Sequence, residues 1–337
     1  MKIDVYTHII PKRFEEALHK KVPGSFFGSG WIDTNPTLTN LDNRFRIMDQ
    51  YEGLVQVLTL GNPPVEQVVD KQGAAELAMI ANDELAELLV KYPDRFVAAA
   101  ACLPMNDMDA ALKEFDRAVV ELGLRGVEVY TPINGKPIDY PEFLPLLEKL
   151  VYYDLPIWIH PRRGSDVPDY ACEDKSKYFA HSIFGWAYET TMTMTRFVFS
   201  GLFEKYPTLK VITHHSGGMV PYFAERISCN VDYNLLHMHY KYEHHLTRRP
   251  IDYFRMFYND TAVYGNTAAL MCCYAFCGAE HMMFGTDMPY DSQFGFRHVR
   301  ETIRSILEMD ISEAEKKLIF EDNAKRLLRL PLYRSFK

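Results

Sequence analysis

Short apolar runs alternate along this chain with longer stretches of helical periodicity. The runs with strand character cover residues 2–7, 54–60, 95–103, 125–131, 155–161, 209–215, 256–261 and 281–287. Between them, apolar residues recur at positions i, i+3 and i+4, most clearly over 74–92 and 108–123. Asn106 is placed to cap the second of these helices. The alternation is typical of βα units that build a parallel sheet.

The number of units favours one architecture. Eight strand–helix units in a chain of 337 residues fit a (β/α)₈ barrel, whose usual size is about 250 residues before insertions. A doubly wound sheet is the alternative. Two segments, 22–38 and 162–186, break the repeat, and both follow the predicted ends of strands, where barrel loops cover functional sites. We therefore expect an α/β fold of the barrel type, with a single domain over residues 1–337 and loop insertions at these two segments.

Polar side chains of an unusual kind stand at the ends of four predicted strands. They are Tyr6 and His8 in the first strand, His160 in the fifth, His214 and His215 in the sixth, and Asp287 in the eighth. The carboxyl ends of barrel strands meet on one face, so we expect these groups to converge. Neutral imidazole and carboxylate suit Zn²⁺ or a similar divalent ion. The pattern therefore predicts a metal site with an open position for substrate or water.

A second group of histidines lacks this arrangement. It consists of His237, His239, His244 and His245, in a stretch that is helical or irregular. Residues two apart on a helix face different directions, and no strand end aims these side chains together. We interpret them as surface histidines, or as residues that support the metal ligands without binding the metal themselves.

Charge and hydropathy limit the partners of the protein. The 37 basic and 45 acidic residues give a net charge of −8, which argues against a nucleic-acid partner held by counterion release. No apolar run reaches the roughly 18 residues of a membrane span, and the first residues lack the order of a signal peptide. We therefore expect a cytoplasmic protein that binds neither membranes nor nucleic acid.

Several segments together resemble a known family. They are KIDVYTHIIP at the start, MDQYEGLVQVLTL from Met48, LPIWIHP from Leu155, GLFEKYPTLKVITHHSGGMVPYFAERI from Gly201, FYNDTA from Phe257, MMFGTDMPY from Met282 and NAKRLLRL from Asn323. They span nearly the whole chain, which resembles the amidohydrolase-related (amidohydrolase 2) family of metal-dependent (β/α)₈ barrels. That family includes the decarboxylases of aminocarboxymuconate semialdehyde, γ-resorcylate and 5-carboxyvanillate.

The resemblance implies roles for single residues. His8, His160 and Asp287 fall on the metal-ligand positions of the family. His215 falls on its catalytic strand-six histidine, and Asp287 is the other candidate for delivering a proton. His214 then lies beside the catalytic histidine, where it is a candidate for contact with the substrate.

The resemblance also implies how a substrate is held. An arginine before the second strand binds substrate carboxylate in the semialdehyde branch, and both Arg44 and Arg46 fit that position. Arg162, after the fifth strand, is a further candidate for substrate binding. The loop aromatics available as walls for a planar substrate are Phe26, Phe27, Trp31 and Trp186.

Tyr6 departs from the family pattern, in which this position is usually His and in some decarboxylases Glu. A phenol has a reference pKa of about 10, but a bound cation favours the phenolate, so Tyr6 is one candidate for an oxygen ligand. A second interpretation is that Tyr6 only forms hydrogen bonds, which leaves His8, His160 and Asp287 as the ligands. A third is that the changed residue marks a metal-free protein.

The resemblance favours non-oxidative decarboxylation of an aromatic or conjugated unsaturated carboxylic acid, with one divalent metal ion and no organic cofactor. Zn²⁺ is the expected ion, and Mn²⁺ or Mg²⁺ is the alternative if phenol or water replaces an imidazole. Hydrolysis or hydration of a small carboxylic acid, lactone or amide by the same residues is a second interpretation, and a non-catalytic binding protein is a third. Because family members are commonly dimers or tetramers, the resemblance also implies a homo-oligomer.

Overall fold

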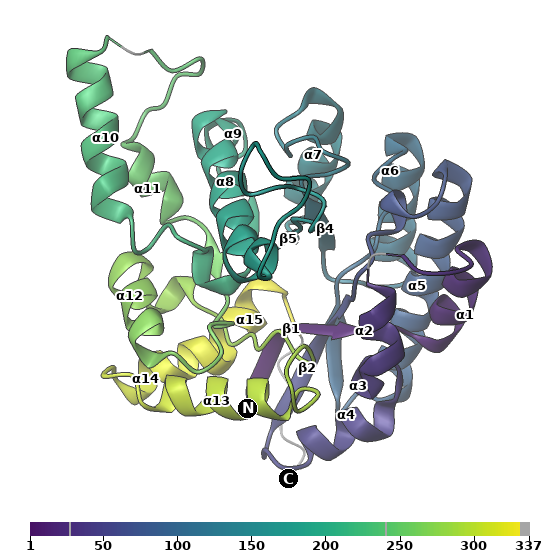
Figure 1. Cartoon of the computed structure of the whole chain (residues 1–337). Coiled ribbons are helices and arrows are strands. Elements are labelled where there is room, and N and C mark those ends of the chain that lie inside the picture. The colour runs from purple at the N-terminus through teal and green to yellow at the C-terminus, as the bar shows by residue number, and fades with distance from the viewer. Residues whose placement is uncertain (27, 240, 331–337) are drawn as a thin grey trace.

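The computed structural model describes residues 1–26, 28–239 and 241–330. Its strands are β1 (Lys2–Ile9), β2 (Leu54–Leu60), β3 (Phe96–Ala99), β4 (Val127–Thr131), β5 (Pro156–Pro161), β6 (Lys210–Thr213) and β7 (Tyr258–Asn259). Its helices are α1 (Lys12–Lys21), α2 (Ser29–Thr34), α3 (Pro36–Thr39), α4 (Leu41–Met48), α5 (Lys71–Lys91), α6 (Met108–Asp116), α7 (Leu144–Tyr153), α8 (Trp186–Phe199), α9 (Leu202–Lys205), α10 (Ala224–His237), α11 (Pro250–Phe254), α12 (Thr267–Cys277), α13 (Phe296–Leu307), α14 (Glu313–Lys317) and α15 (Asn323–Leu327). Strands lie at the centre and the longer helices surround them (Figure 1).

Two parallel sheets are joined into a closed barrel. Their strand orders are β1-β2-β3 and β4-β5-β6-β7. Ala101 pairs with Val127 between β3 and β4, and Asn259 at the end of β7 pairs with Met282. The segment 282–288 then continues alongside β1. These connections close the ring of parallel strands and confirm the predicted (β/α)₈ barrel.

The eighth predicted strand is irregular. The backbone N–H of Asp287 donates to the Tyr6 carbonyl at 3.0 Å, and the N–H of His8 donates to the Met288 carbonyl at 2.9 Å. These bonds hold the segment against β1. However, Asp287 has a φ of 62°, in the left-handed region, and this turns the backbone away from the extended path. The regular ladder is therefore lost at the residue that carries the carboxylate.

Alternate residues of the strands divide between two layers, as the two-residue period of a strand requires. In β5, Ile157 and Ile159 pack with the surrounding helices. Trp158 packs instead with Ile3 and Val5 of β1 and is fully buried. Its indole N–H donates to the Val5 carbonyl at 2.9 Å. This inner layer forms the floor beneath the polar strand ends.

Two local details differ from the sequence prediction. The segment 22–38 contains the short helices α2 and α3 rather than only a loop. Helix α6 is capped by Asp107, whose side chain accepts from the backbone N–H of Ala110 at 3.2 Å. The predicted cap, Asn106, instead donates to the Glu66 carbonyl at 3.4 Å. The cap thus lies one residue later than predicted, because Asn106 is used to hold the neighbouring turn.

Helix α10 projects from the barrel (Figure 1), whereas Ile251, Tyr253 and Phe254 of α11 pack into the core. No residue of α10 is buried. His237, His239, His244 and His245 lie at the end of α10 and after it, and all are exposed, as predicted. In the part of the chain that the structure describes, no helix combines the length and the apolar character needed to cross a membrane.

Candidate metal centre and active site

The polar strand-end residues converge at one end of the barrel. His8, His160 and His214 each offer a ring nitrogen, and these atoms lie within 4.8 Å of one another. His214, His215 and Asp287 form a second group under the same limit. Of the set that the resemblance implies, His8 lies near both His160 and Asp287, and His214 lies near all three.

Asp287 lies at the centre of this cluster. Its Oδ1 atom is 3.2 Å from Nε2 of His8 and 3.2 Å from Nε2 of His214. Its Oδ2 atom accepts a hydrogen bond from the hydroxyl of Tyr264 at 2.7 Å and lies 3.9 Å from Nε2 of His215. One carboxylate oxygen therefore faces two imidazoles, and the other faces a phenol and a third imidazole.

Three imidazoles use Nδ1 for contacts outside the centre. Nδ1 of His8 lies 3.1 Å from the hydroxyl of Thr59, and Nδ1 of His160 lies 2.8 Å from the carbonyl of Pro161. Nδ1 of His214 bonds to the carboxylate of Asp260. Partners of this kind fix the ring orientation of metal-binding histidines. Nε2 of each ring therefore remains available to bind a metal ion.

The free ring atoms fit a divalent metal ion. The buried Nε2 atoms of His8 and His214 form no hydrogen bond among the residues described, although each lies 3.2 Å from Oδ1 of Asp287. A buried polar atom without a partner costs free energy, which binding to a metal removes. Several imidazoles with one carboxylate form a donor set typical of Zn²⁺ and related ions. We conclude that the residues present suit the ion that the resemblance implies.

The charge states of the cluster agree with metal binding. Burial lowers the pKa of His8 and of His160, so both rings are neutral, as a ligand must be. Burial alone would raise the pKa of Asp287, but the imidazoles of His214 and His8 hold it well below its ordinary value. His8 and His160 therefore supply neutral nitrogens beside an ionised carboxylate.

The two histidines after β6 have opposite electrostatic surroundings. Burial opposes the charged form of His214, but the carboxylates of Asp260 and Asp287 raise the pKa of His214 to about 10. Burial and the neighbouring His214 lower the pKa of His215 to about 3. Consecutive residues thus differ in charge, since His214 lies between two carboxylates and His215 does not.

The backbone explains how both histidines reach one site. Successive residues of a strand point to opposite faces. His214 is extended, whereas His215 has a φ of 55°, and the two ring centroids lie only 3.9 Å apart. Tyr264 and Asp287 also have positive φ values, of 55° and 62°. Such conformations cost about 1–3 kcal/mol each and concentrate at functional sites.

Tyr6 packs inside the cluster as a neutral phenol. Its ring stacks on that of His214, with centroids 3.9 Å apart and an interplanar angle of 8°. The side chain is fully buried. Burial, reinforced by the carboxyl groups of Glu128 and Asp260, raises the pKa of Tyr6 well above its usual value. In the metal-free chain Tyr6 is therefore a neutral phenol, and its hydroxyl forms no hydrogen bond among the described residues. A ligand role for Tyr6 stays a prediction.

A cavity of about 570 Å³ opens onto the cluster, and Asp287 lines it. Trp31, Trp186 and Tyr290 form aromatic walls, with Trp31 6.1 Å from Trp186 and 5.7 Å from Tyr290 between ring centroids. Two of the predicted wall residues, Trp31 and Trp186, therefore lie where a planar substrate would bind. Phe26 packs against His19 instead. Phe27 lies outside the described residues.

The structure does not bring the predicted arginines to this cavity. Arg44 is fully buried and donates to the side chain of Gln56 at 2.9 Å and to the carbonyl of His8. Arg46 lies on α4 and is exposed, away from the cavity lining. Arg162 follows β5 and interacts electrostatically with Asp166 and Glu66. The guanidinium of Arg44 thus supports the strand that carries His8.

Sequence reasoning missed three residues of the site. Asp260 directly follows β7, so the strand-end pattern that selected His160 and Asp287 was available for it. Arg297 lies near the start of α13 and lines the cavity. Tyr264 lies in the loop after β7 and contacts Asp287 from a left-handed backbone conformation. No local sequence pattern predicts this conformation.

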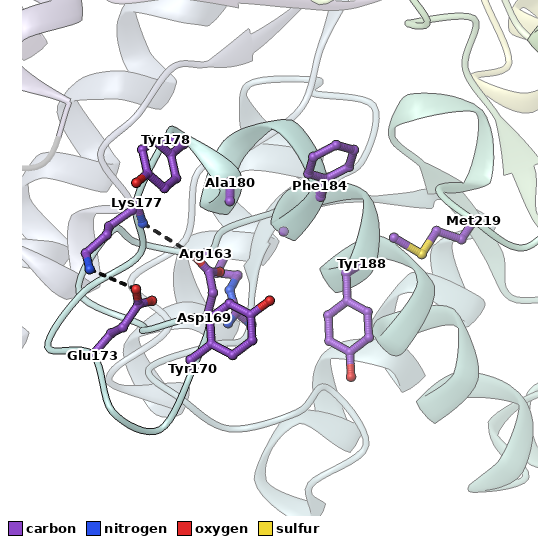
Figure 2. Close-up of a pocket in the computed structure, with 11 residues that line it drawn as sticks. Arg163, Asp169, Tyr170, Glu173, Lys177, Tyr178, Ala180, Phe184, Tyr188 and Met219 are labelled. Carbon is purple, nitrogen blue, oxygen red and sulfur yellow. Dashed lines mark hydrogen bonds and ion pairs between the residues drawn. The ribbon is translucent and has the colours of Figure 1, made fainter.

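The loop after β5 forms a second, open hollow of about 640 Å³ (Figure 2). Around it, Lys177 is paired with Glu173 at 2.9 Å, and the aromatic rings of Tyr170 and Tyr188 stand at its edge. None of the clustered histidines, nor Asp287, lines this hollow. The chemistry therefore belongs to the smaller cavity.

A closed parallel barrel with imidazoles and a carboxylate at the carboxyl ends of its strands defines a barrel protein of the metal-dependent hydrolase type. The chain belongs to the amidohydrolase family, whose model, described as Amidohydrolase, matches residues 3–330. This confirms the resemblance that the sequence motifs indicate.

Several known proteins that this chain resembles are decarboxylases. The γ-resorcylate decarboxylase of Rhizobium sp. (strain MTP-10005) is 32% identical over 321 residues, which cover 92% of each chain. A solved 2,6-dihydroxybenzoate decarboxylase in complex with 2,6-dihydroxybenzoate has a TM-score of 0.79 at 30% identity and covers 98% of this chain and 99% of its own. A dihydroxybenzoic acid decarboxylase from Polaromonas sp. JS666, with manganese and the inhibitor 2-nitroresorcinol, has the same TM-score and identity and covers 97% and 96%.

Proposed function

We propose that this protein is a metal-dependent, non-oxidative decarboxylase of an aromatic carboxylic acid that carries a hydroxyl group next to its carboxylate. The observation that carries the proposal is the position of Asp287, between two imidazoles on one side and Tyr264 on the other, at the wall of an aromatic cavity. The similarity to decarboxylases of γ-resorcylate and 2,6-dihydroxybenzoate supports this substrate class.

His8, His160 and Asp287 would hold the metal ion. When bound, a divalent ion acts as a Lewis acid and as a template that fixes the substrate carboxylate and its neighbouring hydroxyl. The imidazole-rich donor set keeps Zn²⁺ as our first choice. Mn²⁺ is the second choice, because it is bound in a similar decarboxylase.

The cavity positions the aromatic ring. Trp31, Trp186 and Tyr290 present ring faces and edges that a planar acid can contact. Holding the ring fixed relative to Asp287 removes much of the entropic cost of bringing the reacting groups together. Arg297 lies at the same cavity and offers a charged donor for a carboxylate or a phenolic oxygen.

Decarboxylation exchanges the carboxylate for a proton. The bond between the ring carbon and the carboxylate breaks, its electron pair stays on the ring carbon, carbon dioxide leaves, and a proton bonds to that carbon. We assign the delivery of this proton to Asp287, which lines the cavity. Because this carboxylate is ionised in the resting site, it must first take up the proton, whose source is water. The hydroxyl of Tyr264 donates to Oδ2 of Asp287 at 2.7 Å and lies 3.2 Å from Nε2 of His215. Tyr264 and His215 are therefore the residues through which Asp287 would receive its proton.

The test is a substrate screen with the metal-loaded protein and carboxyl-labelled acids. We expect labelled carbon dioxide and the matching phenol from 2,6-dihydroxybenzoate or another 2-hydroxybenzoic acid. 4-Hydroxybenzoate, which lacks the adjacent hydroxyl, is the control and should react at least tenfold more slowly. Incorporation of water without carbon dioxide would identify a hydrolase or hydratase, and tight binding without turnover would identify a binding protein. Either result would contradict the proposal.

We further propose that a second copy of this chain covers the loop after β5. The side chains of Tyr170, Tyr178, Phe179, Phe184 and Tyr188 are between 45% and 90% exposed. Four of them line the open hollow, and Phe179 adjoins Tyr178 (Figure 2). At roughly 200 Å² per aromatic side chain, they expose on the order of 700 Å². This is close to the roughly 800 Å² that each partner buries in a standard interface and large for a monomer surface.

Light scattering after size-exclusion chromatography tests this interface. The parent should elute with twice the mass of one chain or more, and the double variant Y178S/F184S should shift toward the monomer. Tyr152, on α7, is 81% exposed and does not line the hollow, so Y152S is the matched control and should leave the mass unchanged. A parent that is monomeric at micromolar concentration would disprove the proposal.

A further inference from the structure

We infer that His214, oriented by Asp260, is itself a metal ligand and replaces the strand-one ligand that Tyr6 does not supply. The inference rests on the proposed function only in requiring that a divalent ion occupies this centre. It differs from the set that the family resemblance implies, where His214 is a neighbour of the catalytic histidine. It also gives Tyr6 a definite role.

The distances around Asp287 place His214 as close to the centre as an expected ligand. Nε2 of His214 and Nε2 of His8 each lie 3.2 Å from the same oxygen of Asp287. Two ligand atoms bound to one zinc ion at about 2.0–2.1 Å in a tetrahedral arrangement are about 3.3 Å apart. His214 therefore meets the same geometric condition as His8. The ring nitrogens of His8, His160 and His214 also lie within 4.8 Å of one another.

The surroundings of His214 leave its Nε2 atom for a metal. Nδ1 of His214 is bonded to the carboxylate of Asp260, which also accepts from the backbone N–H of Ser216 at 2.9 Å and of Ala262 at 3.1 Å. Asp260 is thus fixed by the backbone, and it fixes the imidazole in turn. A carboxylate behind a histidine is the common arrangement at metal sites, where it orients the ring and strengthens it as a ligand. Nε2 of His214 is buried and forms no hydrogen bond in the described part of the chain, although it lies 3.2 Å from Oδ1 of Asp287. A metal ion that binds this atom displaces its proton.

Tyr6 acts as a positioning residue for His214. Its ring lies flat against the imidazole, at 3.9 Å and 8°, which restricts rotation of the histidine side chain. Gly285 permits this packing, because a Cβ atom at this position would lie 3.0 Å from Cβ of Asp260 and 3.3 Å from Cβ of Tyr6. Tyr6, His214 and Asp260 therefore form one tightly packed unit. Tyr6, which stands where the family usually has a ligand, thus supports His214, which acts as the ligand instead.

A rival account uses the same contacts without a metal. In it, His214 is an imidazolium that pairs with Asp260 and Asp287 and only relays protons. The two accounts differ in one measurable respect. If His214 is a ligand, its removal weakens metal binding, whereas the loss of a proton relay leaves metal binding unchanged.

The experiment measures the binding of Zn²⁺ and Co²⁺ to chelator-stripped protein, by competition with a chromophoric chelator and by the visible absorption of Co²⁺. The parent should bind one equivalent. H214A should bind Zn²⁺ at least 100-fold more weakly and should change the Co²⁺ spectrum. H215A, which removes the adjacent imidazole, is the matched control and should remain within about threefold of the parent. The double variant Y6H/H214A should recover at least tenfold of the lost affinity, because it restores the strand-one ligand.

The outcomes separate this inference from the proposed function. If the parent binds one metal ion and H214A binds it with unchanged affinity and an unchanged spectrum, the inference is wrong while the decarboxylase proposal stands. If the folded parent binds no metal ion, both fail. Circular dichroism of each stripped variant verifies folding, and if H214A is unfolded, D260N takes its place. That variant keeps the imidazole but loses the orienting charge, and should weaken Zn²⁺ binding about 10–100-fold.

Discussion

At the scale of single residues, Asp287 connects two functions because its oxygens have different neighbours. Oδ1 lies between the imidazoles of His8 and His214, and Oδ2 accepts from Tyr264. The same carboxylate is therefore placed to bind a metal on one side and to exchange a proton on the other. Tyr264 and Asp260 matter through this geometry, since each bonds to a group that the sequence already identified, Tyr264 to Asp287 and Asp260 to His214.

Arg297 is the residue to which we assign substrate affinity. It lines the cavity, whereas the predicted Arg44 is buried behind β1 and Arg46 is exposed on α4. We expect R297Q to raise KM for a 2-hydroxybenzoic acid about tenfold, the value of one charge-assisted hydrogen bond. The value of kcat should change less than threefold. Steady-state kinetics measure both constants, and R46Q is the control. An unchanged KM in R297Q would refute this role.

At the scale of elements, the periodicity of the sequence predicted the strands and the barrel, because core burial imposes a two-residue period on strands and a longer one on helices. It also predicted His8, His160 and Asp287 as neighbours, since carboxyl ends of barrel strands meet. It also placed His214 and His215 at this face, but it did not predict how two consecutive residues reach one site. That result depends on the left-handed backbone at His215, which tertiary packing imposes.

Gly285 shows how closely the elements are packed around the site. G285A should destabilise the protein by about 1–3 kcal/mol. The added methyl group would lie 3.0 Å from Cβ of Asp260, which is fully buried. Thermal unfolding of the metal-free protein measures the change. G30A is the control, since a Cβ atom there meets nothing within 4 Å and φ is not positive. Equal melting temperatures for G285A and the parent would show that the packing is looser than described.

The turn after β2 carries a carboxyl group that links stability to pH. Burial raises the pKa of Glu66 from 4.5 to about 7. The folded protein therefore keeps this proton between pH 4.5 and 7, while the unfolded chain loses it. In this range the contribution of Glu66 to stability falls as pH rises, by up to about 1.4 kcal/mol per pH unit.

The variant E66Q removes this dependence. Its unfolding free energy, minus that of the parent, should increase by about 2–3 kcal/mol between pH 5 and pH 7.5, as the linkage of one proton requires. Urea unfolding of metal-free protein at both pH values measures the difference. E52Q, at an exposed position, is the control, and its unfolding free energy should change with pH as that of the parent does. A difference for E66Q that is the same at both pH values would contradict the assignment.

At the scale of the whole molecule, the barrel brings together residues that are distant in sequence. The segment 282–288 bonds to β1 across nearly the full length of the chain, through Asp287 to Tyr6 and His8 to Met288. Closing the barrel and assembling the metal centre are therefore the same structural event. A metal ion that binds only the folded chain should stabilise the closed barrel in proportion to its concentration and affinity.

The most direct test of the account is a metal titration read by catalysis. Chelator-stripped protein is titrated with Zn²⁺, and separately with Mn²⁺, while the release of carbon dioxide from 2,6-dihydroxybenzoate or the best acid of the screen is followed. We predict no release from the stripped protein and a rate that rises linearly and stops rising at one equivalent of metal per chain. A rate that does not depend on metal, or metal-loaded protein that releases no carbon dioxide from any acid of the screen, would contradict the central claim.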